Sequence, residues 1–243
     1  MFDLSSTFTW IAGFAILSAI VNGLGILAIF RYRTWAEKAK TYFMCFAAGI
    51  LVSVPLTLAL PNAIQKNFYA GFTALIGFLF MFFSNRLIKR HTKARELAFG
   101  VTAAEGIGIH SFIDGIVYTV TFQASILVGI LAGTGMVVHE FAEGVITYLV
   151  LIRGGAKRKL SMLYAFMIAG LTTPIGAFIV YPLVSGVKDV ELGLLLGFAA
   201  GVLLYLSSSH LLPEAREQEK EHSSIAFLAG VGLALFIVAT KLF

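Results

Sequence analysis

Two near-copies of one short phrase carry the residues best suited to chemistry. His110-Ser111-Phe112-Ile113-Asp114-Gly115 and His139-Glu140-Phe141-Ala142-Glu143-Gly144 both read His-x-x-x-acid-Gly, and both lie inside long apolar runs. Residues four apart share one face of a helix, so each histidine faces the same way as its acid. Neutral imidazole and carboxylate together suit first-row divalent metals such as zinc. The two phrases therefore predict a metal site between two helices.

The elements that position these phrases are predicted to be membrane spans. Of the 243 residues, 58% are hydrophobic and 13% are charged, whereas a soluble domain carries about a quarter charged residues. The apolar runs are long enough to cross a bilayer. The net charge of +5 comes from short loops and does not indicate a nucleic-acid partner. We expect an all-α polytopic membrane protein with one domain, residues 1–243, surrounded by lipid. Its single cysteine, Cys45, excludes an intrachain disulfide and a cysteine-rich metal site.

Eight transmembrane helices are predicted from the apolar runs. They span about residues 9–30, 42–60, 68–85, 97–120, 126–151, 161–184, 191–212 and 223–241. Fifteen of the 18 lysines and arginines follow the odd-numbered spans. Basic loops stay on the cytoplasmic side, so both termini are expected outside.

An internal repeat relates the second and seventh spans. Phe46-Ala47-Ala48-Gly49 recurs as Phe198-Ala199-Ala200-Gly201, and Leu60-Pro61 recurs as Leu212-Pro213, both 152 residues later. The two spans run in opposite directions, so spans 1–3 and 6–8 are predicted to be inverted copies that flank spans 4 and 5. This 3+2+3 inverted repeat is typical of secondary transporters, which bind substrate near the middle of the membrane.

The predicted topology places the two histidines at one depth. His110 and His139 each lie 13 residues after the start of their spans, which is about 20 Å along a helix. The apolar core is about 30 Å thick, so both side chains fall near its middle. A mid-membrane charge costs roughly 2.5–3.5 kcal/mol, and a shared divalent cation would offset this cost. A metal-free hydrogen-bond network is the simpler interpretation for one such pair, but two matched pairs favour a metal.

These paired phrases resemble the motifs of the ZIP (Zrt/Irt-like) divalent metal transporters. Eight spans, outside termini and the 3+2+3 arrangement are also similar to that family, over nearly the whole chain. The resemblance implies a first metal site formed by His110, Asp114, His139 and Glu143. It also implies that Ser111 and Glu140 face a neighbouring second site.

The sequence departs from the family at two positions near that second site. Ser111 stands where the family usually has Asn. Thr173, before Pro174, stands where several bacterial members have Glu. The chain is therefore expected to depend on the first site, with Glu140 as a conditional fifth ligand.

Three further polar residues lie in other spans. His210 and Glu214 are four residues apart at the inner end of span 7. A solvated helix end is the first interpretation of this pair, and a step in metal release is the second. Asn22 in span 1 is expected to make an interhelical hydrogen bond.

The leading functional hypothesis is transport of a divalent transition metal toward the cytoplasm by alternating access, with spans 4 and 5 gated against the flanking repeats. Zinc is the first expectation, and the same ligands accept Fe²⁺, Mn²⁺, Co²⁺ and Cd²⁺. The ion is substrate, and no cofactor and no enzymatic activity are expected. The compact loops favour a prokaryotic inner membrane, and a homodimer is left open.

Two alternatives belong to other functional classes. His139-Glu140 begins like the zinc-protease phrase His-Glu-x-x-His, which suggests an intramembrane metalloprotease. Position 143 is Glu, however, so the second histidine is absent. The other alternative is a carrier for a different substrate, in which the acids form a proton relay.

Overall fold

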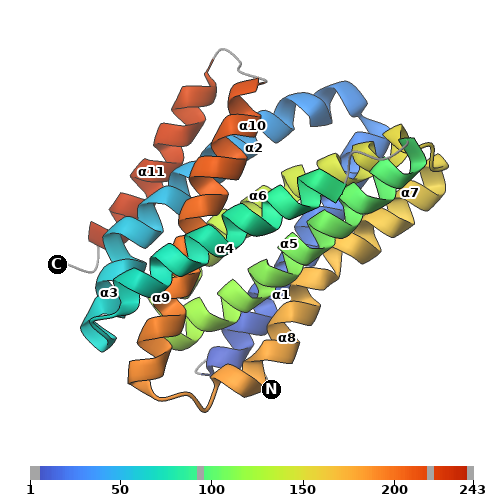
Figure 1. The fold of residues 1–243 in the computed structure, drawn as a ribbon. Helices are drawn as coiled ribbons and strands as arrows, with labels where there is room; N and C mark the ends of the chain where they lie inside the picture. Colours follow the sequence, from blue (N-terminus) through green and yellow to red (C-terminus); the bar gives the residue numbers. More distant parts are fainter. Residues whose placement is uncertain (1–5, 92–95, 218–221, 240–243) are drawn as a thin grey trace.

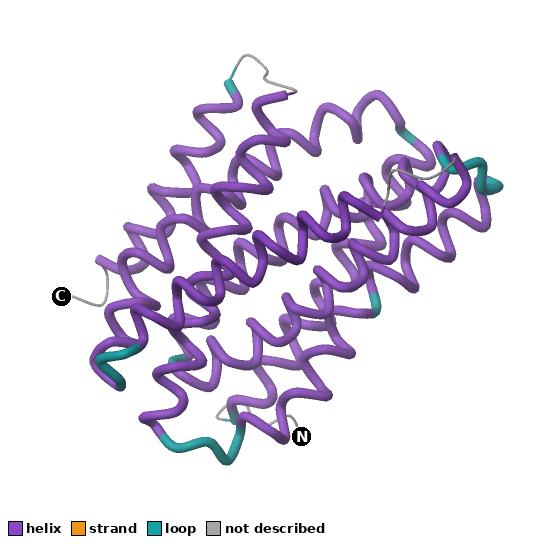
Figure 2. Tube along the Cα trace, viewed as in Figure 1, coloured by secondary structure: helices purple, strands orange, loops and turns teal. Residues whose placement is uncertain are grey.

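The computed structural model describes residues 6–91, 96–217 and 222–239, and this part of the chain contains helices and no strands (Figure 2). The helices in chain order, with three π-helical segments labelled η, are α1 (Thr7–Arg31), α2 (Arg33–Val54), η1 (Pro55–Ala59), α3 (Leu60–Lys66), α4 (Ala70–His91), α5 (Glu96–Ala124), α6 (Ile126–Arg153), α7 (Arg158–Ala165), η2 (Phe166–Gly170), α8 (Thr172–Val184), α9 (Asp189–Tyr205), η3 (Leu206–Leu211), α10 (Leu212–Glu217) and α11 (Ser223–Ala239).

Each predicted span coincides with one helix or one run of consecutive helices. Within the described residues, five such rods are long and apolar enough to cross a membrane: Thr7–Arg31, Arg33–Lys66, Ile126–Arg153, Arg158–Val184 and Asp189–Leu211. Two shorter apolar helices are Ala70–Ser84 and Ser223–Ala239. The all-α, polytopic fold class is confirmed. The count of eight spans and the outside position of the termini stay predictions.

The π-helical segments lie just before prolines. η1, η2 and η3 end two to four residues before Pro61, Pro174 and Pro213. Proline has no N–H, and its ring clashes with the carbonyl four residues earlier, so the preceding turn must open. The 152-residue offset of the repeat places residues 55–59 of η1 on residues 207–211 of η3.

The helices pack in two sets, which also meet along an extensive contact between α2 and α6. In one group α1 packs on α6, α5 packs on α8, and α5 contacts α6. In the other group α2 packs on α11 and α4 packs on α9. Figure 1 shows α1, α5 and α8 side by side. The first helix of each repeat therefore packs with the central pair, so the division is not simply spans 4 and 5 against two triplets.

The same glycine contact occurs twice, each time between a helix of one predicted repeat and a helix of the other. A Cβ on Gly230 of α11 would collide with the backbone carbonyl of Phe46 on α2. A Cβ on Gly77 of α4 would collide with the carbonyl of Phe198 on α9. Phe46 and Phe198 are the repeat-equivalent residues identified from sequence. Close backbone approach at small residues is how membrane helices pack, and these two contacts are what the predicted inverted repeat requires.

A matched pair of glycines in α11 tests this packing. Gly230→Ala should lower the thermal stability of the detergent-purified protein, because the new methyl group meets backbone that cannot move aside. Gly232→Ala is the control, since nothing lies within 4 Å of a Cβ there, and it should leave stability unchanged or slightly raised. Equal melting temperatures for the two variants would contradict the described α2–α11 contact.

Candidate metal centre

The two histidine phrases meet across the contact between α5 and α6. Asp114 Oδ2 lies 3.7 Å from His110 Nε2 on its own helix and 3.3 Å from His139 Nε2 on α6. Glu143 Oε2 lies 3.5 Å from His139 Nε2. The two imidazole centres are 6.2 Å apart. The structure thus brings together His110, Asp114, His139 and Glu143, hereafter the His–carboxylate cluster.

The glycine that ends each histidine phrase allows another helix to pack closely against the helix that carries the phrase. A Cβ on Gly115 of α5 would collide with the backbone carbonyl of Thr173, at the start of α8. A Cβ on Gly144 of α6 would collide with the carbonyl of Asn22 on α1. Neither glycine therefore lies at the contact between α5 and α6. They bring α8 and α1 against the backs of the helices that carry the cluster.

The cluster is buried and its polar atoms are left unpaired. The side chains of Asp114 and His139 are 1% and 2% exposed, and that of Glu143 is 8% exposed. The cluster atoms without a hydrogen-bond partner among the described residues are His110 Nε2, Asp114 Oδ1 and Oδ2, His139 Nδ1 and Nε2, and Glu143 Oε2. Buried polar atoms normally have partners. One donor atom each from His110, Asp114 and His139 lie within 4.8 Å of one another, a set that suits a divalent transition metal.

The two residues expected at a second site point in different directions. Ser111 donates hydrogen bonds to Glu143 Oε1 and to the carbonyl of Ile107, both at 3.0 Å, so it supports the cluster. Glu140 is fully buried, and one of its oxygens lies within 4.8 Å of oxygens of Asp114 and Glu143. Three carboxylates therefore gather beside two imidazoles.

Both oxygens of Glu140 are held by residues from other helices. Asn22 Nδ2 on α1 donates to Oε2 at 2.8 Å. Thr173 Oγ1 on α8 donates to Oε1 at 2.9 Å. The expected interhelical hydrogen bond of Asn22 is confirmed. The sequence did not predict that Asn22 and Thr173 would both bind Glu140. The three residues lie on three different spans, and no local motif joins them.

The structure describes His210 and Glu214, the two residues considered for metal release, only in part. η3 places the half-buried His210 ring 5.3 Å from that of His110, centre to centre. His210 therefore lies beside the cluster and before the end of its helix rod, and both interpretations of its role stay predictions. Glu214 belongs to α10, but its side chain falls outside the described residues.

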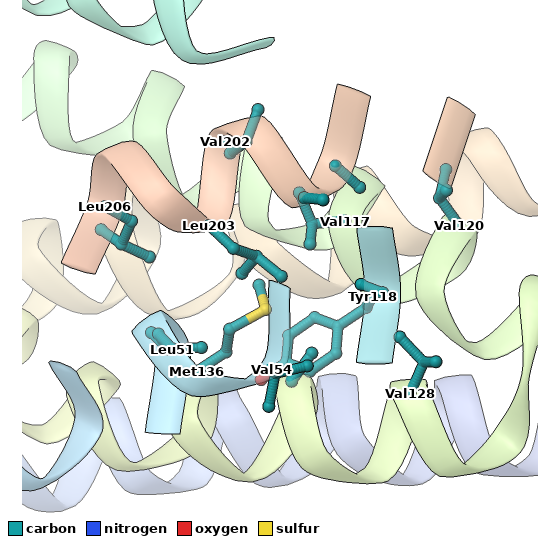
Figure 3. Packing of buried hydrophobic residues seen from close by; sticks show 14 of the residues in the cluster. Leu51, Val54, Val117, Tyr118, Val120, Val128, Met136, Val202, Leu203 and Leu206 are labelled. Atoms are coloured by element: carbon teal, nitrogen blue, oxygen red, sulfur yellow. The ribbon is translucent and has the colours of Figure 1, made fainter. Parts of the chain in front are cut away.

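The two sides of the cluster differ in access. Tyr118 follows Asp114 by one turn of α5, and Met136 precedes His139 by about one turn of α6. Both are fully buried, as are Leu51 and Leu203, which stand at repeat-equivalent positions in α2 and α9. Figure 3 shows these side chains packed together. On the opposite side the His110 side chain is 15% exposed, so the Tyr118 side of the cluster is the more deeply buried of the two.

Comparison with known proteins identifies similar sequences over the same region. Residues 97–238 match the family model described as "ZIP Zinc transporter". The chain is 32% identical to the zinc transporter ZupT of Xanthomonas axonopodis, with 99% of this chain and 100% of the relative covered. It is 31% identical to that of Lysinibacillus sphaericus, with 95% and 96% covered. The match to that of Clostridium perfringens, at 37% identity, covers 59% of this chain and 50% of the relative.

Binding of metal at the cluster predicts a gain in stability. Zinc at about 100 times its dissociation constant should stabilise the purified protein by about 2.7 kcal/mol, seen as a higher melting temperature in detergent. The gain should vanish in the His110→Ala, His139→Ala double variant. His222→Asn, which changes an exposed histidine and suits its positive φ of 105°, should keep the gain. No shift with zinc, cadmium, manganese or iron would favour the proton-relay alternative.

Proposed function

This chain belongs to the ZIP family of zinc transporters, and from that premise we propose that it carries zinc toward the cytoplasm through the His–carboxylate cluster. It is an integral, multi-pass membrane protein and a transporter, not an enzyme. Bacterial relatives named as zinc transporters support zinc as substrate. Fe²⁺, Mn²⁺, Co²⁺ and Cd²⁺ remain competing substrates, because the same ligands accept them.

One observation carries the choice of site. The unpaired atoms of the cluster come from all four predicted ligands and lie on two helices buried in an apolar bundle. Leaving them unpaired in such surroundings costs several kcal/mol, and a divalent cation supplies the missing partner. The expected position at mid-membrane follows from the predicted topology.

Access from one side at a time follows from the two helix groups. We propose that α1, α5, α6 and α7–α8 move together against α2, α4, α9 and α11, since the first group surrounds the cluster and the second group forms its other wall. With basic loops inside, the more deeply buried Tyr118 side faces outward and the His110 side faces the cytoplasm. The described conformation is then open to the inside, and sliding of the groups would open the other side. All of residues 1–243 belong to this single transporting domain.

The exit route begins at His210 in this proposal. Its ring is the neighbour of the His110 ring, so the ion passes from the cluster to His210 and then toward Glu214 at the inner helix end. At this spacing the ion can contact the His210 imidazole before it leaves the His110 imidazole.

The alternative of an intramembrane zinc hydrolase has no support. A general base needs a carboxylate within reach of a metal-bound water, and both oxygens of Glu140 already accept hydrogen bonds. We place the protein in a bacterial plasma membrane because its relatives are zinc transporters of bacteria.

Zinc uptake by the purified protein in sealed vesicles tests the function. Wild type should move zinc down its gradient at a saturable rate, and the His110→Ala, His139→Ala double variant should lose most of this flux. The His222→Asn variant, matched for loss of a histidine, should transport normally. Unchanged uptake by the double variant would rule out the cluster as the transport site.

The exit route has its own kinetic signature. His210→Ala should lower the maximal rate of uptake more than it changes the half-saturating zinc concentration, because release follows binding. Ser208→Ala is the control on the same π-helical segment, since Ser208 is exposed and donates to the carbonyl of Leu204. Equal maximal rates for the two variants would remove His210 from the route.

A further inference from the structure

Asn22 and Thr173 occupy corresponding places in the packing of α1 and α8 against the central pair, one residue off the 152-residue offset that relates spans 2 and 7. They lie 151 residues apart on the first helix rods of the two repeats, α1 and α8. Their backbone carbonyls contact Gly144 and Gly115, the glycines that end the two histidine phrases. Symmetry alone would pair Asn22 with Glu140, four residues before Gly144, and Thr173 with Ser111, four residues before Gly115.

The hydrogen bonds break this symmetry in favour of Glu140. Thr173 donates to Glu140 at 2.9 Å, while Ser111 turns to Glu143 at 3.0 Å. The Asn22 side-chain amide donates a hydrogen bond to the other oxygen of Glu140 at 2.8 Å. One carboxylate thus receives donors from both repeats.

This pattern sorts the five candidate ligands into two kinds. His110, Asp114, His139 and Glu143 each keep at least one unpaired buried atom. Glu140 keeps none, because each of its oxygens accepts a hydrogen bond from a neutral side chain. Glu140 is therefore held in place by the protein, whereas the other four have atoms free for an ion.

Holding Glu140 has an electrostatic consequence. The three carboxylates lie within 4.8 Å at their nearest oxygens, and like charges at this distance repel strongly in a buried site. Hydrogen bonds to a carboxylate are stronger than neutral ones and offset part of its burial. The hydrogen bonds from Asn22 and Thr173 therefore fix where the oxygens of Glu140 lie relative to Asp114 and Glu143.

We propose that Asn22 and Thr173 are positioning residues of the metal site, which fix the Glu140 carboxylate in place beside a single bound ion. This inference rests on the proposed function of the cluster. Partners of metal-site carboxylates commonly change metal affinity by about 10–100-fold when they are lost. The pair would thus set affinity without touching the ion.

Zinc titration of the detergent-purified protein against a chromophoric chelator tests the assignment. Wild type should bind one zinc per chain. Thr173→Val, which keeps the shape and removes the hydroxyl, and Asn22→Leu should each weaken binding by about 10-fold or more. Thr173→Ser should restore binding close to wild type. Two zinc ions per chain, or wild-type affinity in both Thr173→Val and Asn22→Leu, would overturn the proposal.

A matched control separates positioning from folding. Thr119→Val also removes a buried threonine hydroxyl at the α5–α8 contact, but Thr119 donates only to the backbone carbonyls of Gly115 and Ala177. It should leave zinc affinity unchanged. An equal loss in Thr119→Val and Thr173→Val would show a general packing effect and reject the assignment.

A double-mutant cycle tests the route through Glu140. Thr173→Val should weaken zinc binding in the wild-type background and have little further effect in Glu140→Gln. The same fold-loss in both backgrounds would mean that Thr173 does not act through Glu140. Vesicle uptake reports on the proposed function separately: a wild type that binds zinc but does not move it would refute transport and leave the binding cycle valid.

Discussion

The structure depends on burying three carboxylates and two imidazoles in the middle of an apolar helix bundle. Such groups are costly where water is absent, so their partners must come from the protein or from the substrate. The protein supplies donors to both oxygens of Glu140 and to one oxygen of Glu143. It leaves the remaining atoms of the cluster unpaired. In the proposed function, the ion coordinates these atoms, for which the described residues supply no other partner.

The inverted repeat explains how one short chain builds this site. Each repeat contributes a first helix that packs behind the central pair, through Gly115 against Thr173 and through Gly144 against Asn22. The other two helices of each repeat form the second group, with a glycine contact that occurs twice between the copies. Two similar halves with opposite orientation give a site two possible access routes, which is what a transporter requires.

Departures from the symmetry of the repeat give the two sides of the site different properties. Thr173 and Asn22 both donate to Glu140 on α6, and neither donates to Ser111, its counterpart on α5. Leu51 and Leu203 remain equivalent and close the Tyr118 side with apolar contacts (Figure 3). On the other side, His210 in η3 corresponds by the 152-residue offset to Leu58 in η1. A histidine near the cluster in one repeat therefore corresponds to an apolar residue in the other.

The sequence by itself determined the membrane class, the helix positions, the repeat and the four cluster residues. Hydrophobic runs, the i, i+4 spacing of each histidine and acid, and the matched offsets are local signals, and local signals can be read without a fold. Only the tertiary structure decided which helix lies behind which. It turned Gly115 and Gly144 toward α8 and α1, set His210 beside His110, and joined Asn22 and Thr173 to Glu140 across more than 30 positions of sequence in each case. These contacts depend on how separate spans pack, and no pattern within one span encodes the partner on another.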